Sequence, residues 1–531
     1  MYTLFHNAKI YTLEQHTPIC NAILIQNNRI LFLGDEKEIN IPDSQLTKIN
    51  LNGYTILPAF TDCHTHTAMA AKKIDEINLD HCQTFDETLQ EIKKNIHRFE
   101  KGTWIKGGGW NANLWNGFLP TKYHLDAIST EHPIALFNQD LHTMWLNSLA
   151  IQKARIENNI PSVLKDKIIV DKNGELTGII YEDACHLVEE EAQVSSPDND
   201  EQNLIKFSNE LLKMGITSVH CMENLNDLEL LMKLHRNNKL KTRICFHPPA
   251  ADADTFINSK IFSGYGNEWL RIGGLKYYVD GSMGSQTAEM FEKFNELDHA
   301  GFEMLTEKEL TQKIKYAAHH GLSATVHAIG DKANFKTLNA IEESNHQTHS
   351  PIPLRHRIEH SQILTDSDIP RFNQLNIIAS MQPLHIAIDV KISDKYLGKR
   401  AYNTYPINSL IKSGAKVVFG SDLPVANFSP FKGMQAAIAR RYNLDVQEPL
   451  WHPEQNISVL QAVEAYTKHA AFASYEESVK GTLTAGKLAD FVIVSDDLLE
   501  SKNPEEALRS IEVLATVLDG NIEYQKENFD L

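Results

Sequence analysis

Apolar, strand-like segments alternate with helical segments along the central part of the chain. Helical windows such as Glu307–His320 and Asn334–Asn345 separate the strands. The first predicted strand is the apolar run Tyr54–Phe60, which leads into His64 and His66. Seven more follow at Ile216–Cys221, Thr242–His247, Ile272–Val279, Leu322–Ala328, His356–His360, Ile377–Gln382 and Lys416–Asp422. Alternating β and α segments with eight buried strands predict an α/β fold, a (β/α)8 TIM barrel.

A doubly wound open sheet is the alternative fold for such a pattern. That fold more often shows a glycine-rich phosphate turn directly after a strand. We find no such turn in this sequence, and the barrel is therefore favoured.

Both ends of the chain have a different pattern from the centre. The first fifty residues and the last fifty read as short strands, with Asn27-Asn28 and Asp519-Gly520 as hairpin turns. Residues 70–205 show neither pattern and mix amphipathic helices with an apolar strand at Pro133–Asn138. We therefore expect five segments: 1–54 and 476–531 as two parts of a small β-sandwich, 55–69 as the first barrel strand, 70–205 as an inserted α+β subdomain that contacts substrate, and 206–475 as the remainder of the barrel.

Charge and cysteine usage narrow the class of protein. The formal net charge of −18 argues against a nucleic-acid or acidic-membrane partner, because such partners require basic patches. The six cysteines are scattered without a CxxC motif, which is typical of reduced thiols in a cytoplasmic protein. The chain shows neither a signal-peptide pattern nor an apolar segment of membrane-spanning length. We expect a cytoplasmic protein with a small-molecule substrate, and base rates favour a homodimer.

Histidines and an aspartate occur where predicted strands end. Side chains two apart on a strand face the same way, so His64 and His66 provide half of a metal site. His327, His360 and Asp422 each lie at or near the carboxyl end of a predicted strand. Barrel enzymes build their sites on that face. This convergence predicts a metal centre, although a single histidine in such a chain is more often a structural or surface residue.

Asp422 and Lys276 each allow two interpretations. An aspartate after a strand can cap the next helix, or it can bind a metal and exchange protons with water. Lys276 can pair with a carboxylate. If it faces a metal it must be neutral or carboxylated by CO2, which would make it a bridging ligand, and Gly273 and Gly274 leave room for that modification.

An ordered set of motifs covers nearly the whole chain. The set comprises Leu57–His66, Asp140–Ser148, Val279–Ala288, Val326–Asp331, Arg355–Gln362, Ala379–Pro383, Phe419–Val425 and Gly486–Phe491. In these motifs the chain resembles the amidohydrolase superfamily, and within it the YtcJ-like branch that includes N-substituted formamide deformylases. The resemblance implies a metal-bearing TIM barrel with a β-sandwich built from both termini. It also implies the metal ligands His64, His66, Lys276, His327, His360 and Asp422, with Lys276 at the position of a carboxylated lysine.

The predicted activity is hydrolysis of a carbon–nitrogen bond other than a peptide bond. A metal-activated water would attack an amide-type substrate, such as an N-formyl or N-acyl amine, with Asp422 as acid and base. The ligand set favours zinc, as one or two ions, although other divalent metals can bind such ligands. The candidate substrate contacts are Trp110, Trp115, Asp140, His142, Trp145 and His385. Ordinary packing is an equal alternative for Trp115 and Trp145.

Two other functions compete with this prediction. A deaminase of a heterocyclic amine with a single metal would not need Lys276. A metal-free pseudoenzyme with a binding or regulatory role would be expected to have lost a ligand, whereas all candidate positions are filled here.

Overall fold

The computed structural model describes residues 2–79, 81–115, 118–138, 143–156, 162–192, 197–347, 350 and 352–531. The chain divides into two compact units. The larger unit contains Met1–Ala70 and Leu204–Leu531, and the smaller one is Ala71–Asn203. Within the described ranges, no helix is both long and apolar enough to cross a lipid bilayer.

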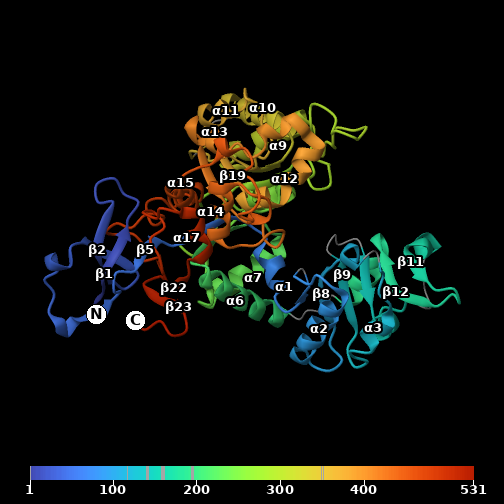
Figure 1. The fold of residues 1–531 in the computed structure, drawn as a ribbon. Helices are drawn as coiled ribbons and strands as arrows, with labels where there is room; N and C mark the ends of the chain where they lie inside the picture. The colour runs from blue at the N-terminus through green and yellow to red at the C-terminus, as the bar shows by residue number, and fades with distance from the viewer. Residues whose placement is uncertain are drawn as a thin grey trace. The chain divides into compact units, whose positions relative to one another are not determined.

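Both ends of the chain share one sheet in the larger unit (Figure 1). Its eight strands are β1 (Tyr2–Tyr11), β2 (Ile19–Gln26), β3 (Arg29–Gly34), β4 (Leu46–Asn50), β5 (Thr55–Pro58), β21 (Phe491–Val494), β22 (Val513–Leu518) and β23 (Asn521–Gln525). Phe5, Ile56 and Phe491 meet in its core. The strands are hydrogen-bonded in the order β23-β22-β21-β5-β1-β2-β3, with β4 beside β1. The two termini thus contribute to one hydrogen-bonded sheet, and the predicted sandwich stays a prediction.

Two parallel sheets make up the rest of the strand structure in this unit. One has the order β15-β14-β13-β6, and its strands are β6 (Phe60–Thr65), β13 (Ile216–Cys221), β14 (Arg243–Phe246) and β15 (Leu270–Ile272). The other runs β16-β17-β18-β19-β20, with strands β16 (Leu275–Tyr278), β17 (Ala324–Ala328), β18 (Arg357–His360), β19 (Ile378–Met381) and β20 (Lys416–Phe419). Every pair is parallel. This is an α/β fold whose parallel strands form two sheets, and the predicted barrel stays a prediction.

The predicted strand Ile272–Val279 is divided at Gly273 and Gly274. The two parts have different partners, because β15 pairs with β14 whereas β16 pairs with β17. A Cβ atom on Gly273 would lie 2.4 Å from the His247 ring, and one on Gly274 would lie 2.6 Å from Thr325 Oγ1. The two glycines therefore allow close approach of neighbouring strands, and they do not provide room around Lys276.

The apolar run Tyr54–Phe60 also differs from the prediction. It contributes to two strands in two sheets, since β5 pairs with β1 and β21 of the terminal sheet and β6 pairs with β13. The break falls at Ala59, whose N–H donates to Asp490 O over 3.2 Å. An apolar run indicates that its residues are buried, but it does not indicate which sheet each residue joins.

Helices alternate with strands along the larger unit, and the first of them, α6, begins within the smaller unit. Helix α9 shows how the sequence sets one of them: Thr306 and Glu309 form a capping box, and Leu310, Ile314 and Ala317 bury one face. The helices are α6 (Pro197–Lys213), α7 (Leu225–Arg236), α8 (Ala253–Asn258), α9 (Glu307–His319), α10 (Asp331–Gln347), α11 (Ile369–Gln374), α12 (Pro383–Leu397), α13 (Ile407–Lys412), α14 (Pro430–Ala439), α15 (Val459–Tyr466), α16 (Lys468–Ala473) and α17 (Pro504–Ser510).

The smaller unit has its own sheet and core, and helix α1 (Thr67–Lys72) carries the chain into it. The sheet order is β11-β12-β10-β9-β8-β7. The strands are β7 (Ile77–Asn78), β8 (Ile105–Trp110), β9 (Ile134–Asn138), β10 (Thr143–Leu146), β11 (Ile168–Val170) and β12 (Leu176–Tyr181), and the helices are α2 (Phe85–Asn95), α3 (Lys122–Asp126), α4 (Ser148–Lys153) and α5 (His186–Ala192). Trp110 and Trp145 lie in its hydrophobic core.

A buried arginine ties the terminal sheet to the first parallel sheet. Arg243, the first residue of β14, is 1% exposed. Its Nε and Nη2 donate to the two carboxylate oxygens of Asp490 over 2.6 and 3.0 Å, and Nη2 also donates to Asp519 Oδ1 over 2.9 Å. Asp490 belongs to the motif Gly486–Phe491, so this motif has a structural role.

Replacing Arg243 with methionine should lower the free energy of unfolding by about 3–5 kcal/mol, because the carboxylate of Asp490 loses its buried partner. Urea denaturation of the purified protein measures this loss. Lys241→Met is the matched control, since Lys241 Nζ pairs with Glu523 Oε2 at 2.7 Å while both side chains are partly exposed. The control should change stability by about 1 kcal/mol or less. Equal losses in the two variants would contradict a special role for the buried pair.

Candidate metal centre

The backbone after β20 lies directly against the end of β6. Asp422 N–H donates to His64 O over 2.7 Å, and His66 N–H donates to Leu423 O over 2.8 Å. A Cβ atom on Gly420 would lie only 2.4 Å from His64 N, so glycine is required at this approach. Two segments more than 350 residues apart thereby place their side chains in one cluster.

Asp422 lies between the two histidines of the first motif. Its Oδ1 is 3.3 Å from His64 Nε2 and 3.4 Å from His66 Nε2. His64 is 1% exposed and Asp422 is 8% exposed. One ligand atom from each residue lies within 4.8 Å of the others, so the three side chains can hold a metal ion.

A second group of three shares the same aspartate. His360 ends β18, and His385 lies in the first turn of α12. Ligand atoms of His360, His385 and Asp422 also lie within 4.8 Å of one another. His360 Nδ1 and His385 Nε2 are buried, and neither has a hydrogen-bond partner among the described residues. Buried imidazole nitrogens beside an anionic carboxylate fit a divalent cation.

Backbone strain coincides with these ligand positions. His360 has a φ of 72° and Asp422 has a φ of 60°, both in the left-handed region that costs a non-glycine residue about 1 kcal/mol or more. Such strain persists where the surrounding structure imposes it, and it clusters at functional sites.

Electrostatics keep the shared aspartate charged. Burial raises the pKa of Asp422, but the neighbouring His64 and the hydrogen bonds from His64 and His66 outweigh it and hold this pKa well below its usual range. Burial and the Lys276 ammonium lower the pKa of His64, yet the carboxylates of Asp422 and Glu359 raise it overall. Burial and the neighbouring His327 hold the pKa of His360 well below its usual value, which leaves that ring neutral.

Lys276 and His327 lie nearby but have other partners. Lys276 Nζ is 3.2 Å from Met222 Sδ and 5.0 Å from the centre of the Tyr278 ring. Burial lowers the pKa of Lys276 to about 8. His327 Nε2 lies 3.0 Å from Gly281 O, and burial lowers the pKa of His327 to about 4.

Glu359 is a site residue to which the sequence analysis assigned no role. Its Oε2 lies 2.5 Å from His64 Nδ1, and its two oxygens accept from Arg357 Nε and Nη2 over 2.5 and 3.1 Å. Burial raises the pKa of Glu359, but Arg357 and then His64 hold it well below its usual range. A carboxylate on Nδ1 fixes the tautomer of His64 and leaves Nε2 toward Asp422. Two charged residues spaced two apart in a buried strand are the signal that could have revealed it.

Two aspartates of the motifs, Asp62 and Asp280, accept hydrogen bonds from backbone N–H groups. Asp62 Oδ1 accepts from Ser421 N over 2.9 Å and from His64 N over 3.2 Å. Asp280 accepts from the N–H groups of Glu289, Ile329 and Gly330 over 2.8–3.0 Å. Both positions therefore stabilise the loops that carry the candidate ligands.

The predicted substrate contacts of the smaller unit lie in its core or outside the described residues. Trp110 Nε1 donates to Leu136 O over 2.8 Å, and Trp145 Nε1 donates to Thr121 O over 3.0 Å. Trp115 stacks on Trp110 with ring centres 5.8 Å apart. The three indoles thus pack together, and a contact with substrate stays a prediction. Asp140 and His142 fall outside the described residues.

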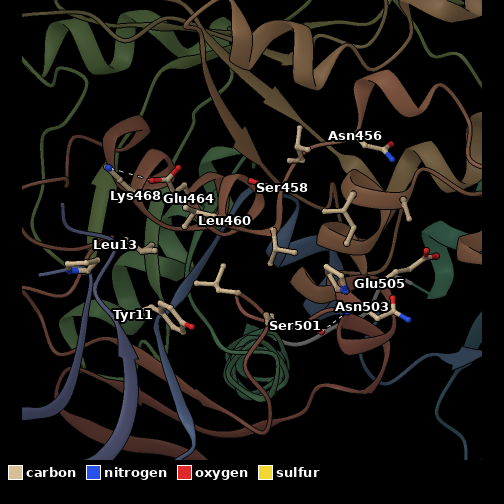
Figure 2. A pocket seen from close by; sticks show the side chains of 18 of the residues that line it. Tyr11, Leu13, Asn456, Ser458, Leu460, Glu464, Lys468, Ser501, Asn503 and Glu505 are labelled. Atoms are coloured by element: carbon tan, nitrogen blue, oxygen red, sulfur yellow. Dashed lines mark hydrogen bonds and ion pairs between the residues drawn. The ribbon is translucent and has the colours of Figure 1, made fainter.

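A cavity of about 850 Å³ lies elsewhere in the larger unit (Figure 2). Its wall comes from the terminal sheet and from α15 and α17, and includes Tyr11, Leu13, Ser458, Leu460, Asn503 and Glu505. None of the candidate metal ligands lines it. The cavity is therefore separate from the candidate metal centre.

Comparisons with known proteins agree with a metal-dependent hydrolase. A model of the amidohydrolase family matches residues 47–524. The chain is 30% identical to Protein LONG AFTER FAR-RED 3 of Arabidopsis thaliana, over 97% of this chain and 90% of that protein. It is 28% identical to the putative amidohydrolase YtcJ of Bacillus subtilis, over 99% and 100% of the two chains.

Two further matches extend this result. The chain is 25% identical to an N-substituted formamide deformylase of Arthrobacter pascens, over 98% of each chain. A crystal structure of an uncharacterized metal-dependent hydrolase from Pyrococcus furiosus superposes with a TM-score of 0.76 at 27% identity, over 94% of this chain and 100% of the other. The chain therefore belongs to the amidohydrolase family, in its YtcJ-like branch.

Proposed function

We propose that this protein is a metal-dependent hydrolase that cleaves the carbon–nitrogen bond of an amide-type substrate, such as an N-formyl or N-acyl amine. The single observation that carries the proposal is the convergence of His64, His66, His360 and His385 on one buried carboxylate, Asp422. The similarity to an N-substituted formamide deformylase of Arthrobacter pascens supports the choice of substrate class. A divalent metal held there, with zinc favoured by the nitrogen and oxygen ligands, would polarise a carbonyl group and lower the pKa of water.

The protein's own residues then supply orientation and proton transfer. Asp422 is anionic, so its carboxylate can take the proton of the attacking water and return it to the leaving nitrogen. Glu359 holds the His64 ring with Nε2 toward Asp422. The neutral His360 ring keeps a nitrogen without a hydrogen-bond partner among the described residues, which suits a ligand role.

We also infer that the two parallel sheets are the two arcs of one eight-stranded barrel. Single parallel bridges support this inference, because Thr65 pairs with Leu423 at one junction and Pro249 pairs with Lys276 at the other. In that arrangement the eight barrel strands are β6, β13, β14 and β16 to β20, and β15 is an additional strand. The candidate ligands then lie at the carboxyl ends of the strands, the face where barrel enzymes place their sites.

Metal analysis combined with an activity screen tests the proposed function. Protein purified without chelator should contain a divalent metal, measured by inductively coupled plasma mass spectrometry. It should hydrolyse members of a panel of N-alkyl and N-aryl formamides, measured as amine release. Chelation should abolish this activity, and added Zn²⁺ or Mn²⁺ should restore it.

Two results would redirect the assignment. Release of ammonia from heterocyclic amines, with formamides left intact, would favour a deaminase. If the protein contains no metal and takes none up from a Zn²⁺ solution, the hydrolase proposal is wrong. A binding or regulatory role would then be favoured.

A further inference from the structure

We propose that the cavity of about 850 Å³ in the larger unit is a second binding site, which takes a neutral, largely apolar molecule with a hydroxyl or amide group. Its volume falls within the usual size of small-molecule pockets, roughly 300–1,000 Å³. None of the candidate metal ligands lines the cavity. The proposal therefore stands apart from the proposed function.

Apolar side chains from separate segments meet on the cavity wall. Ile19 begins β2, Leu450 lies in the segment between α14 and α15, and Leu460 lies in the first turn of α15. These side chains are 47%, 42% and 46% exposed, although each lines a concave surface. An apolar molecule that covered them would remove this surface from water, which is favourable. The wall therefore favours a ligand with a substantial apolar part.

Leu13 reaches the same wall through a strained backbone. Its φ of 60° lies in the left-handed region, which is unfavourable for leucine. The neighbouring Thr12 is held on both sides, since its N–H donates to Pro18 O over 3.1 Å and its carbonyl accepts from Leu483 N–H over 2.9 Å. Such strain persists where the surrounding structure imposes it, and it is found where loops hold ligands. The loop between β1 and β2 thus fixes Leu13 on the wall.

The charged side chains of the wall already have partners. Each forms an ion pair, at 2.9 Å for Arg441 and Glu505, 3.6 Å for Lys468 and Glu464, and 3.8 Å for Lys487 and Glu14, and Figure 2 shows the second pair. A charged ligand would therefore lose its hydration without gaining an unpaired counter-charge, which is costly. A neutral ligand avoids this cost.

Two polar side chains of one segment suit the polar end of such a ligand. Asn456 and Ser458 both line the cavity. Asn456 Oδ1 has no hydrogen-bond partner among the described residues. Ser458 Oγ accepts from Gln461 N–H over 3.2 Å, which leaves its own hydrogen for donation. A hydroxyl or amide group can donate to the first side chain and accept from the second.

A series of three probes with the same alkyl chain tests the charge of the ligand. At neutral pH, 1-octanol is uncharged, octylammonium is a cation and octanoate is an anion. Isothermal titration calorimetry of the full chain should give one octanol per chain, with a Kd about tenfold or more below those of both ions. Octanol has no carbon–nitrogen bond, so the result does not depend on the proposed hydrolysis.

Substitutions on the wall locate the bound octanol. Leu460→Asp and Leu450→Asp each place a carboxylate on the apolar wall and should weaken octanol binding about tenfold or more. Asn456→Leu removes the acceptor and should weaken it about fivefold. Leu31→Asp is the matched control, because Leu31 is also 46% exposed but does not line the cavity, and its Kd should stay within about twofold.

Four results would overturn the proposal. The first is no octanol binding by the unaltered protein, and the second is an ion that binds as tightly as octanol. The third is an unchanged Kd in Leu460→Asp, Leu450→Asp and Asn456→Leu, which would place octanol elsewhere. The fourth is a dimer in analytical ultracentrifugation that Leu460→Asp dissociates, because a second copy of the chain would then cover the wall.

Discussion

Replacing Asp422 with asparagine should lower kcat/KM by about 10²–10⁴-fold, the range for loss of a positioned acid–base group. Asparagine keeps the size of the side chain, but it cannot accept the proton of the attacking water. Its neutral amide also removes the negative charge from both candidate ligand groups. The measurement is amine release from the best formamide of the screen, at a Zn²⁺ concentration that saturates the variant.

The saturating metal separates the two roles of Asp422. A variant that regains full activity in excess Zn²⁺ would show that Asp422 acts only as a ligand, which contradicts the acid–base role. Asp394→Asn is the control, because this exposed aspartate on α12 accepts a hydrogen bond from Trp451 and belongs to neither candidate group. The control should stay within about twofold of the unaltered protein.

The position of the site could be predicted because ligand-type residues occur at the ends of buried strands. His64 and His66 are far in sequence from His360 and Asp422, yet the segment after β20 lies against the end of β6 and brings these side chains together. The rule uses only strand ends, so it does not place side chains that start from helices. His385, which we predict to contact substrate, lies in the first turn of α12 and joins a group of possible metal ligands there.

Pairing between strands could not be predicted in the same way. The run Tyr54–Phe60 is apolar throughout, but its residues join two sheets. The strand pattern at Ile272–Val279 likewise hides a change of partner at two glycines. Hydrophobic pattern reports how deeply a strand is buried, whereas strand pairing depends on contacts that are distant in sequence.

Aromatic residues show a similar ambiguity. Trp110 and Trp145 are large, apolar and able to donate one hydrogen bond, so they suit both a pocket wall and a core. Both indole N–H groups donate to backbone carbonyls inside the smaller unit. Residue type alone could not distinguish a tryptophan in a pocket wall from one in a hydrophobic core.

Replacing Glu359 with alanine should produce a loss of both stability and metal affinity. Arg357 is 1% exposed and would lose its carboxylate partner, which should cost about 3–5 kcal/mol of unfolding free energy. His64 would lose the acceptor for its Nδ1–H, and loss of such a partner lowers metal affinity by about 10–100-fold. Urea denaturation measures the first effect, and competition with a chromogenic chelator measures the second.

The double variant Arg357→Met, Glu359→Met separates two effects of Glu359. One is its orientation of the His64 ring, and the other is its contribution to the stability of the protein. Replacing both members of a buried ion pair with apolar side chains restores stability in other proteins, because no unpaired charge remains. We expect the double variant to regain much of the unfolding free energy while its Zn²⁺ affinity stays low, since His64 still lacks its acceptor. Recovery of Zn²⁺ affinity together with stability would mean that Glu359 serves only to neutralise Arg357 and does not orient His64.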